Sequence, residues 1–286
     1  VVTPLGAMEP PAPEDAVTLD SGITVFEEID WNPQPTLKPG MDFHNGITYF
    51  TIPLLRNVIH PPKRKGEDPI MAKELQTYVL SSDHAGLWYD EESLAAHGYM
   101  PNTHLIQELE PRWSRQSARD FLEKQTPGPT SEELFNELRT LYTKYVEFAD
   151  ETYYITMALY IMYTYIFRLF ESTGYIHFNG TMASGKSRNL SILNALAFNA
   201  IWSSSITAAA LYRKLAGSPG TTCIDESEGF DNERGEDLRR ILNAGYKNGS
   251  MVSRTEKGPN ERYITMRYDV FGPKALASIN PLEPVI

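Results

Sequence analysis

The residues best suited to chemistry form one glycine-bounded run, Gly180-Thr181-Met182-Ala183-Ser184-Gly185-Lys186-Ser187. Its spacing, G-x-x-x-x-G-K-[ST], is typical of a loop whose backbone N–H groups wrap phosphates, while the lysine reaches the β- and γ-phosphates and the hydroxyl holds Mg²⁺. The run therefore predicts that these eight residues and the following Arg188 bind ATP, with Ser187 as a ligand of Mg²⁺.

The segments on either side of this loop are those that such a loop needs. Tyr175-Ile176-His177-Phe178 is a short apolar run that predicts a buried strand, and Leu190, Leu193 and Leu196 recur at helical spacing behind the loop. A helix N-terminus adds partial positive charge where an anion binds. The alternative interpretation, a tight glycine turn without a ligand, does not account for the strand and helix.

Two adjacent carboxylates supply the second half of the expected chemistry. The run from Thr221 to Ile224 predicts a strand, and Asp225 and Glu226 follow it directly. We expect Asp225 to hold Mg²⁺ together with Ser187, and Glu226 to polarise an attacking water as a catalytic base beside Lys186. A turn with solvated acids is the alternative. A phosphate-transferring kinase is disfavoured, because an acidic pair suits hydrolysis better.

Further downstream, the pattern predicts a helix at 236–244, a hairpin and one more strand. The hairpin strands are 251–256 and 262–268, and Lys257-Gly258-Pro259-Asn260 is its predicted turn. The last strand spans 269–280, and a polar residue at its end, Asn280 or Ser278, could contact the γ-phosphate or the lytic water as a catalytic group. A plain strand end turning into Pro281 is an equally good interpretation.

The charge of the chain limits how it could bind nucleic acid. Its 286 residues carry a formal net charge of −11, which argues against a broad basic surface that coats duplex DNA. Binding would need a small basic element, and we expect the hairpin to supply it through Lys257, Arg254 and Lys247. Basic residues that only balance nearby glutamates are the alternative, and the loop with Lys63-Arg64-Lys65 is the next candidate.

Other chemistries find less support. The single cysteine, Cys223, lies in an apolar run and predicts a core position in a reducing, cytoplasmic location. The six histidines lack partners at metal-ligand spacing. The apolar run from Tyr153 to Phe167 is too short and too rich in tyrosine to span a membrane, so we expect a buried helix there and no membrane partner.

Composition divides the chain into three predicted parts. Residues 1–20 are proline-rich and predict a flexible arm. Residues 21–125 predict a β-rich accessory domain with strands at 23–29, 47–55 and 76–80. The breaker Thr126-Pro127-Gly128-Pro129 opens the part at 126–286, for which we expect an α/β fold with a parallel sheet flanked by helices, beginning with a capped helix at Thr130 and a second helix at 152–170.

The order of these motifs resembles a known family. The phosphate loop, Thr207-Ala208-Ala209-Ala210-Leu211-Tyr212-Arg213, Asp225-Glu226, a Leu-Arg-Arg-Ile-Leu helix, a hairpin and Gly272-Pro273-Lys274 resemble AAA+ P-loop ATPases of the phage, plasmid and mobile-element primase-helicase type, which are similar to superfamily 3 and MCM-like helicases. The resemblance covers about residues 130–286. It implies a P-loop NTPase fold, a ring that is usually a hexamer, and a hairpin that enters a central channel, with Asn280 or Ser278 as the sensor residue.

The resemblance also implies a function. We expect an ATP-hydrolysing DNA helicase or translocase that replicates a phage, plasmid or integrating element, acts on single-stranded or forked DNA and works with replication proteins. The alternative is an AAA+ switch or remodelling ATPase, such as a loader or a defence component, without unwinding activity. The family places an arginine finger soon after the sensor strand, and this sequence ends before one, so we expect an ATPase core that is truncated before its lid.

Overall fold

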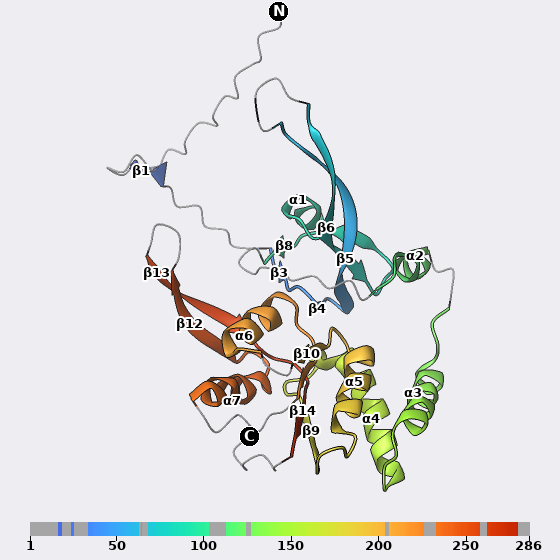
Figure 1. Cartoon of the computed structure of the whole chain (residues 1–286). Coiled ribbons are helices and arrows are strands. Elements are labelled where there is room, and N and C mark those ends of the chain that lie inside the picture. The colour runs from blue at the N-terminus through green and yellow to red at the C-terminus, as the bar shows by residue number, and fades with distance from the viewer. Residues whose placement is uncertain are drawn as a thin grey trace, which may run out of the picture. The chain divides into compact units, whose positions relative to one another are not determined.

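The structure is a computed structural model that describes residues 34–62, 64, 68–102, 113–123, 127–203, 206–225, 233–257 and 262–279, and the backbone of two short strands before them (Figure 1). The chain forms two compact units, 1–35 and 36–286. In the first unit, β1 (Val17–Thr18) pairs antiparallel with β2 (Thr24–Val25). The rest of the predicted arm and of the predicted strand at 23–29 lies outside the described residues, and the predicted domain boundaries stay predictions.

The N-terminal part of the larger unit is β-rich. Its elements are β3 (Thr36–Leu37), β4 (Met41–His44), β5 (Ile47–His60), β6 (Ile70–Ser81), β7 (Gly86–Trp88), α1 (Glu91–Ala95), β8 (Met100–Pro101) and α2 (Arg115–Glu123). An antiparallel sheet has the order β4-β5-β6-β7, and β3 pairs parallel with β8. Asn45 and Gly46 join β4 to β5 with φ of 52° and 80°, as a two-residue hairpin turn requires.

β5 and β6 are longer than the sequence predicts. The strands expected at 47–55 and 76–80 are present, but each continues, and the pair stays in register from Tyr49 opposite Ser81 to His60 opposite Ile70. β4 pairs with β5 only as far as Phe50, and β7 reaches only Tyr78 on β6. Beyond those points the two strands form a two-stranded ribbon, drawn in blue in Figure 1.

Three helical segments precede the parallel sheet: α3 (Ser131–Tyr145), α4 (Glu151–Thr164) and the 3₁₀ helix η1 (Phe167–Leu169). The predicted capping box is confirmed, because Thr130 and Glu133 exchange side-chain and backbone hydrogen bonds. The helix predicted at 152–170 ends early, since the Tyr165 N–H bonds to the Met162 carbonyl three residues back and the chain tightens. Its expected burial is confirmed on the side that packs with Cys223 and Ala275 of the central sheet, whereas Leu159 on the other side is exposed.

A four-stranded parallel sheet forms the centre of the C-terminal part. Its strands are β9 (Tyr175–Asn179), β10 (Ile201–Ser203), β11 (Thr222–Ile224) and β14 (Lys274–Ser278), in the order β10-β11-β14-β9. The helices α5 (Lys186–Leu196), α6 (Ala208–Gly217) and α7 (Glu233–Gly245) connect or follow these strands. The predicted α/β class, a parallel sheet flanked by helices, is confirmed.

Alternation along the strands assigns each side chain to one face of this sheet. Cys223, Ala275 and Ala277 pack in one apolar cluster with residues of α3, α4 and α5. Ile224 and Leu276 pack on the other face with residues of α6 and α7. The sheet is therefore covered on both sides, and the predicted core position of Cys223 is confirmed.

The predicted hairpin is present as β12 (Met251–Lys257) and β13 (Tyr263–Asp269), which pair antiparallel along their full length. Lys257 ends β12 and pairs with Tyr263, so its predicted place in the turn is wrong. Val270 and Phe271 were expected in the last strand, but they precede β14 and lie fully buried.

Candidate nucleotide site and basic hairpin

The run from Gly180 to Ser187 forms an exposed loop between β9 and α5. Gly185 is the N-cap of α5 and has φ of 88°, and Ala183 also has positive φ, at 62°. A Cβ added at Gly180 would lie 2.7 Å from the Ser184 Oγ, so the first glycine allows the loop to close on itself. The loop therefore ends in exposed backbone at the positive end of a helix, as an anion-binding site requires.

Lys186, the first residue of α5, extends back over this loop. Its Nζ donates hydrogen bonds to the carbonyl oxygens of Gly180 and Thr181, each at 2.7 Å. The side chain therefore lies along the strand-to-helix turn and not away from it. Ser187 and Arg188 are exposed beside it on the first turn of α5, and Met182 in the loop is 82% exposed.

The sheet brings the glycine-bounded loop and Asp225 to the same edge. Leu276 of β14 pairs with Ile224 of β11 on one side and with His177 of β9 on the other, so the carboxyl ends of the three parallel strands lie within two residues of one another. Asp225 follows β11 directly, and its N–H donates to the Ser203 carbonyl of β10 at 3.0 Å. One strand separates β9 from β11, which is a spacing of roughly 10 Å.

Two polar contacts fasten β14 to β9 at this edge. The His177 Nε2 lies 2.6 Å from the Ser278 Oγ, and the Asn179 Nδ2 donates to the Ile279 carbonyl at 3.0 Å. Ser278 is buried and bonded to His177, so of the two sensor candidates it is the one held inside the sheet. Asn280, the other candidate, and the predicted base Glu226 lie outside the described residues.

The two faces of the hairpin differ, and this corrects one predicted nucleic-acid residue. Val252 packs on α6 and α7, and Arg254 lies on the same face, where its guanidinium bonds to Asp237 of α7 at 3.1 Å and stacks on the Tyr212 ring. Arg254 is thus tied to the neighbouring helices. Alternation along a strand placed it on the covered face, which the sequence pattern alone did not reveal.

The outward face of the hairpin carries a different set of residues. Lys257 is exposed there as predicted, and Arg267 and Tyr263, neither of which was predicted, are exposed on the same face of β13. Lys247 is exposed in the turn between α7 and β12. One sequence signal could have identified Arg267. Tyr263 is the cross-strand partner of Lys257, and every second residue after Tyr263 on the same strand, including Arg267, shares its face.

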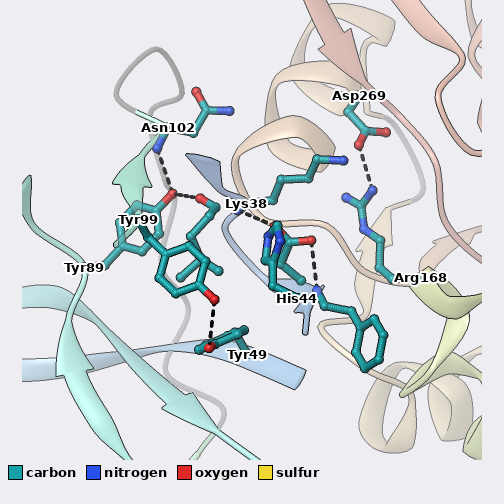
Figure 2. A network of polar contacts seen from close by, with 11 residues as sticks. Lys38, His44, Tyr49, Tyr89, Tyr99, Asn102, Arg168 and Asp269 are labelled. Atoms are coloured by element: carbon teal, nitrogen blue, oxygen red, sulfur yellow. Dashed lines mark hydrogen bonds and ion pairs between the residues drawn. The ribbon is translucent and has the colours of Figure 1, made fainter. Parts of the chain in front are cut away.

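Buried charges hold the base of the hairpin. The Arg168 Nη1 of η1 bonds to the Asp269 Oδ2 at 2.7 Å, and the Lys38 ammonium extends toward this pair (Figure 2). Burial alone would raise the pKa of Asp269, but the charges of Arg168 and Lys38 and the Phe271 N–H together hold it below its ordinary value. The end of β13 is thereby fixed against the 3₁₀ helix.

Lys274, the first residue of β14, is fully buried. Its Nζ donates to the carbonyls of Val270 and Gly272 at 3.0 and 2.9 Å, and it lies 4.9 Å from the centre of the Tyr175 ring. Burial lowers the pKa of this lysine to about 7, against a smaller opposing effect of the Asp269 charge. Lys274 therefore joins the exit of the hairpin to the central sheet.

A second polar network in Figure 2 belongs to the β-rich part. The hydroxyls of Tyr49 and Tyr99 lie 3.1 Å apart, and the Tyr89 hydroxyl donates to the Leu37 carbonyl and accepts from the Asn102 N–H. Burial raises the pKa of Tyr89 to about 12, so this hydroxyl stays protonated at neutral pH. These contacts connect β3, β5 and β8 and are structural.

No protein-family model and no curated protein sequence matches this chain. Within the part of the chain that the structure describes, no helix has the length and apolar character needed to cross a membrane. The same residues include no cluster of three or more His, Cys, Asp or Glu side chains that could hold a metal. A Mg²⁺ ion held by phosphates, one hydroxyl and one carboxylate needs no such cluster.

Proposed function

We propose that the protein is a P-loop ATPase of the AAA+ type that hydrolyses ATP with Mg²⁺ and works as a DNA helicase or translocase, assembled as a ring. The observation that carries the proposal is the register of β9, β14 and β11, which puts the loop of Lys186 and the carboxylate of Asp225 at one edge of the sheet. Loop, helix N-terminus and acid then face one ligand position.

The residues of this edge fit a nucleoside triphosphate with its metal. The exposed backbone of the loop and the α5 N-terminus would hold the phosphates, and the Lys186 ammonium would exchange its two carbonyl partners for phosphate oxygens. Ser187 and Asp225 would hold Mg²⁺, which supplies charge neutralisation for phosphoryl transfer. Glu226, next along the chain, would orient the attacking water, and Asn280 would contact it or the γ-phosphate.

Two substitutions test the site. Lys186→Ala should weaken ATP binding at least tenfold, because it removes the charge that pairs with the phosphates. Glu226→Gln should bind ATP like the wild type but release phosphate much more slowly. Nucleotide affinity and phosphate release are measured for both. Wild-type turnover by the Glu226→Gln variant would contradict its role as the base, and wild-type ATP affinity of Lys186→Ala would contradict the nucleotide site.

The hairpin is the proposed contact with single-stranded DNA. Lys257 and Arg267 on its outward face would neutralise phosphates, and Tyr263, which pairs with Lys257 on the same face, offers a ring for base stacking. The double variant Lys257→Ala with Arg267→Ala should lose DNA stimulation of ATP hydrolysis while basal hydrolysis persists. It should also flatten the dependence of log K on log salt by about 1.4, since each single-strand phosphate contact adds about 0.7.

The matched control removes the same charge elsewhere. Arg119 and Lys144 are exposed on α2 and α3, so the double variant Arg119→Ala with Lys144→Ala changes the net charge equally without touching the hairpin. It should keep DNA stimulation. If wild-type hydrolysis does not respond to DNA at all, the switch or remodelling ATPase without unwinding replaces the helicase as the better proposal.

A further inference from the structure

The outer half of the β5–β6 ribbon exposes an apolar face. Its register pairs Leu55 with Leu75 and Ile59 with Met71. These four side chains point to one side of the ribbon, because cross-strand partners share a face and residues two or four apart on one strand share it too. All four are exposed, with Met71 at 79% and Ile59 at 68%. We call this set the ribbon face.

The opposite side of the same ribbon carries hydrogen-bonded polar side chains beside the exposed Ile70. Arg56 bonds to Gln76 and Asp90 and stacks on the Trp88 ring, and His60 bonds to Glu74. The ribbon face, by contrast, keeps its four apolar side chains exposed within the part of the chain that the structure describes. Two strands alone are marginally stable in water, so a face of this kind favours an external partner.

A second apolar surface lies on α4 and the segment after it. Ile155, Leu159 and Tyr163 recur every four residues on one side of α4, and Phe170 contacts the Tyr163 ring at 5.2 Å. Ile155, Leu159 and Phe170 are exposed, while the opposite side of α4 is packed on the central sheet. We call these four residues the helix stripe.

The charges around the two surfaces are of opposite sign. Lys73 lies within the ribbon face, opposite Asn57, and the exposed Arg64 and Asp68 lie between β5 and β6. The helix stripe is bordered by acids: Glu147, Asp150 and Glu151 at the start of α4, and Glu171 after Phe170. Asp150 caps the helix and Glu151 pairs with Arg139 at 2.9 Å, so Glu147 and Glu171 are the acids least committed to contacts within the chain.

We propose that the ribbon face of one copy of this chain packs on the helix stripe of the next copy. The apolar side chains would bury one another, while Lys73 in the ribbon face would meet the acidic border of the helix stripe. The two surfaces are different parts of one chain, so the contact is heterologous and generates a ring or an open chain of subunits. It involves no residue of the nucleotide site, so it stands or falls separately from the proposed hydrolysis of ATP.

Sedimentation of the full chain without nucleotide, over concentrations up to tens of micromolar, tests this contact. The wild type should associate, and Met71→Glu and Leu159→Lys should each raise the dissociation constant at least tenfold, because each puts a charge in an apolar contact. Met100→Glu is the control: Met100 is exposed on β8, outside both surfaces, and its substitution should leave association unchanged. Circular dichroism of each variant checks that the fold is retained.

Mixing the two defective variants identifies the geometry. Met71→Glu retains an intact helix stripe and Leu159→Lys retains an intact ribbon face, so an equimolar mixture should form heterodimers that grow no further. A wild type that stays monomeric throughout, or variants that associate like the wild type, would overturn the proposal. Recovery of no complex on mixing would also overturn it, because that result indicates a symmetric contact between identical surfaces.

Discussion

The two long hairpins of the larger unit are built alike and covered differently. β12–β13 turns Val252 and Tyr268 onto α6 and α7, and its outward face carries hydroxyls and cations. The outer half of β5–β6 lacks such helices among the described residues and has its apolar side exposed. A hairpin covered by its own chain can present polar groups to a ligand, whereas one with an uncovered apolar side is suited to another protein surface.

Among substitutions that test this difference, we expect the largest loss of stability at Tyr268, on the covered face of β12–β13. Its ring lies 4.6 Å from the Tyr212 ring, and the residue is 5% exposed. Tyr268→Ala should lower the free energy of unfolding by about 3–5 kcal/mol, because it removes a large buried ring and leaves a cavity. Urea unfolding measures the change. A loss below about 1 kcal/mol would show that α6 and α7 do not stabilise the hairpin.

The next largest loss of stability is expected where β13 ends, at the buried pair of Arg168 and Asp269. The Arg168 and Asp269 side chains are only 5% and 16% exposed, so Asp269→Asn leaves a buried guanidinium without its countercharge and should cost about 3 kcal/mol at neutral pH. The folded-state pKa of Asp269 is below its ordinary value, so the carboxylate stabilises the fold fully above about pH 3.8 and loses this contribution as the pH falls through the lower value.

Unfolding of the wild type and of Asp269→Asn from pH 6 down into acid therefore checks both the size and the sign. The difference between the two proteins should shrink as the carboxylate is protonated. Asp237→Asn is the control, because Asp237 pairs with Arg254 on the half-exposed side of the same hairpin and should cost less than about 1 kcal/mol. If Asp269→Asn and Asp237→Asn lowered the free energy of unfolding equally, the buried Arg168–Asp269 pair would have no special role in holding the hairpin.

The sequence predicted the hairpin, the glycine-bounded loop between β9 and α5, and the parallel sheet, because each depends on local signals: alternation, glycine spacing and caps. It did not predict which face of the hairpin is covered. Arg254 and Arg267 are both arginines on strands whose side chains alternate between two faces. The packing of α6 and α7 alone decides that Arg254 faces these helices and bonds to Asp237, while Arg267 is exposed on the other face. Lys274 was taken as part of a family motif, and nothing local signals its complete burial.

The buried Lys274, which joins the hairpin to the central sheet, should make the stability of the fold depend on pH. Its pKa is about 7 in the folded chain and near 10.5 when unfolded, so the unfolded chain binds more protons between these values and stability rises with pH there. One proton corresponds to a slope of up to about 1.4 kcal/mol per pH unit. Unfolding between about pH 7 and 9 should show this slope in the wild type and a smaller one in Lys274→Met. If Lys274→Met showed the same slope as the wild type, a group other than Lys274 would be responsible for the pH dependence of stability.

The smallest effect is expected on the ribbon, where one strand offers a matched pair of leucines. Leu75 is exposed on the ribbon face, and Leu80, five residues along β6, is 6% exposed in a cluster with Ile52 and Ala118.

Measured at low concentration, where copies are apart, Leu75→Ala should change the free energy of unfolding by no more than about 0.5 kcal/mol, whereas Leu80→Ala should cost about 2–5 kcal/mol. Both substitutions remove the same atoms from the same strand, so the difference between their changes in unfolding free energy reports how much burial by neighbouring residues contributes. Raising the concentration should separate Leu75→Ala from the wild type, because association then stabilises the wild type by mass action and the variant less. A large loss for Leu75→Ala at low concentration would mean that this chain itself covers the ribbon face.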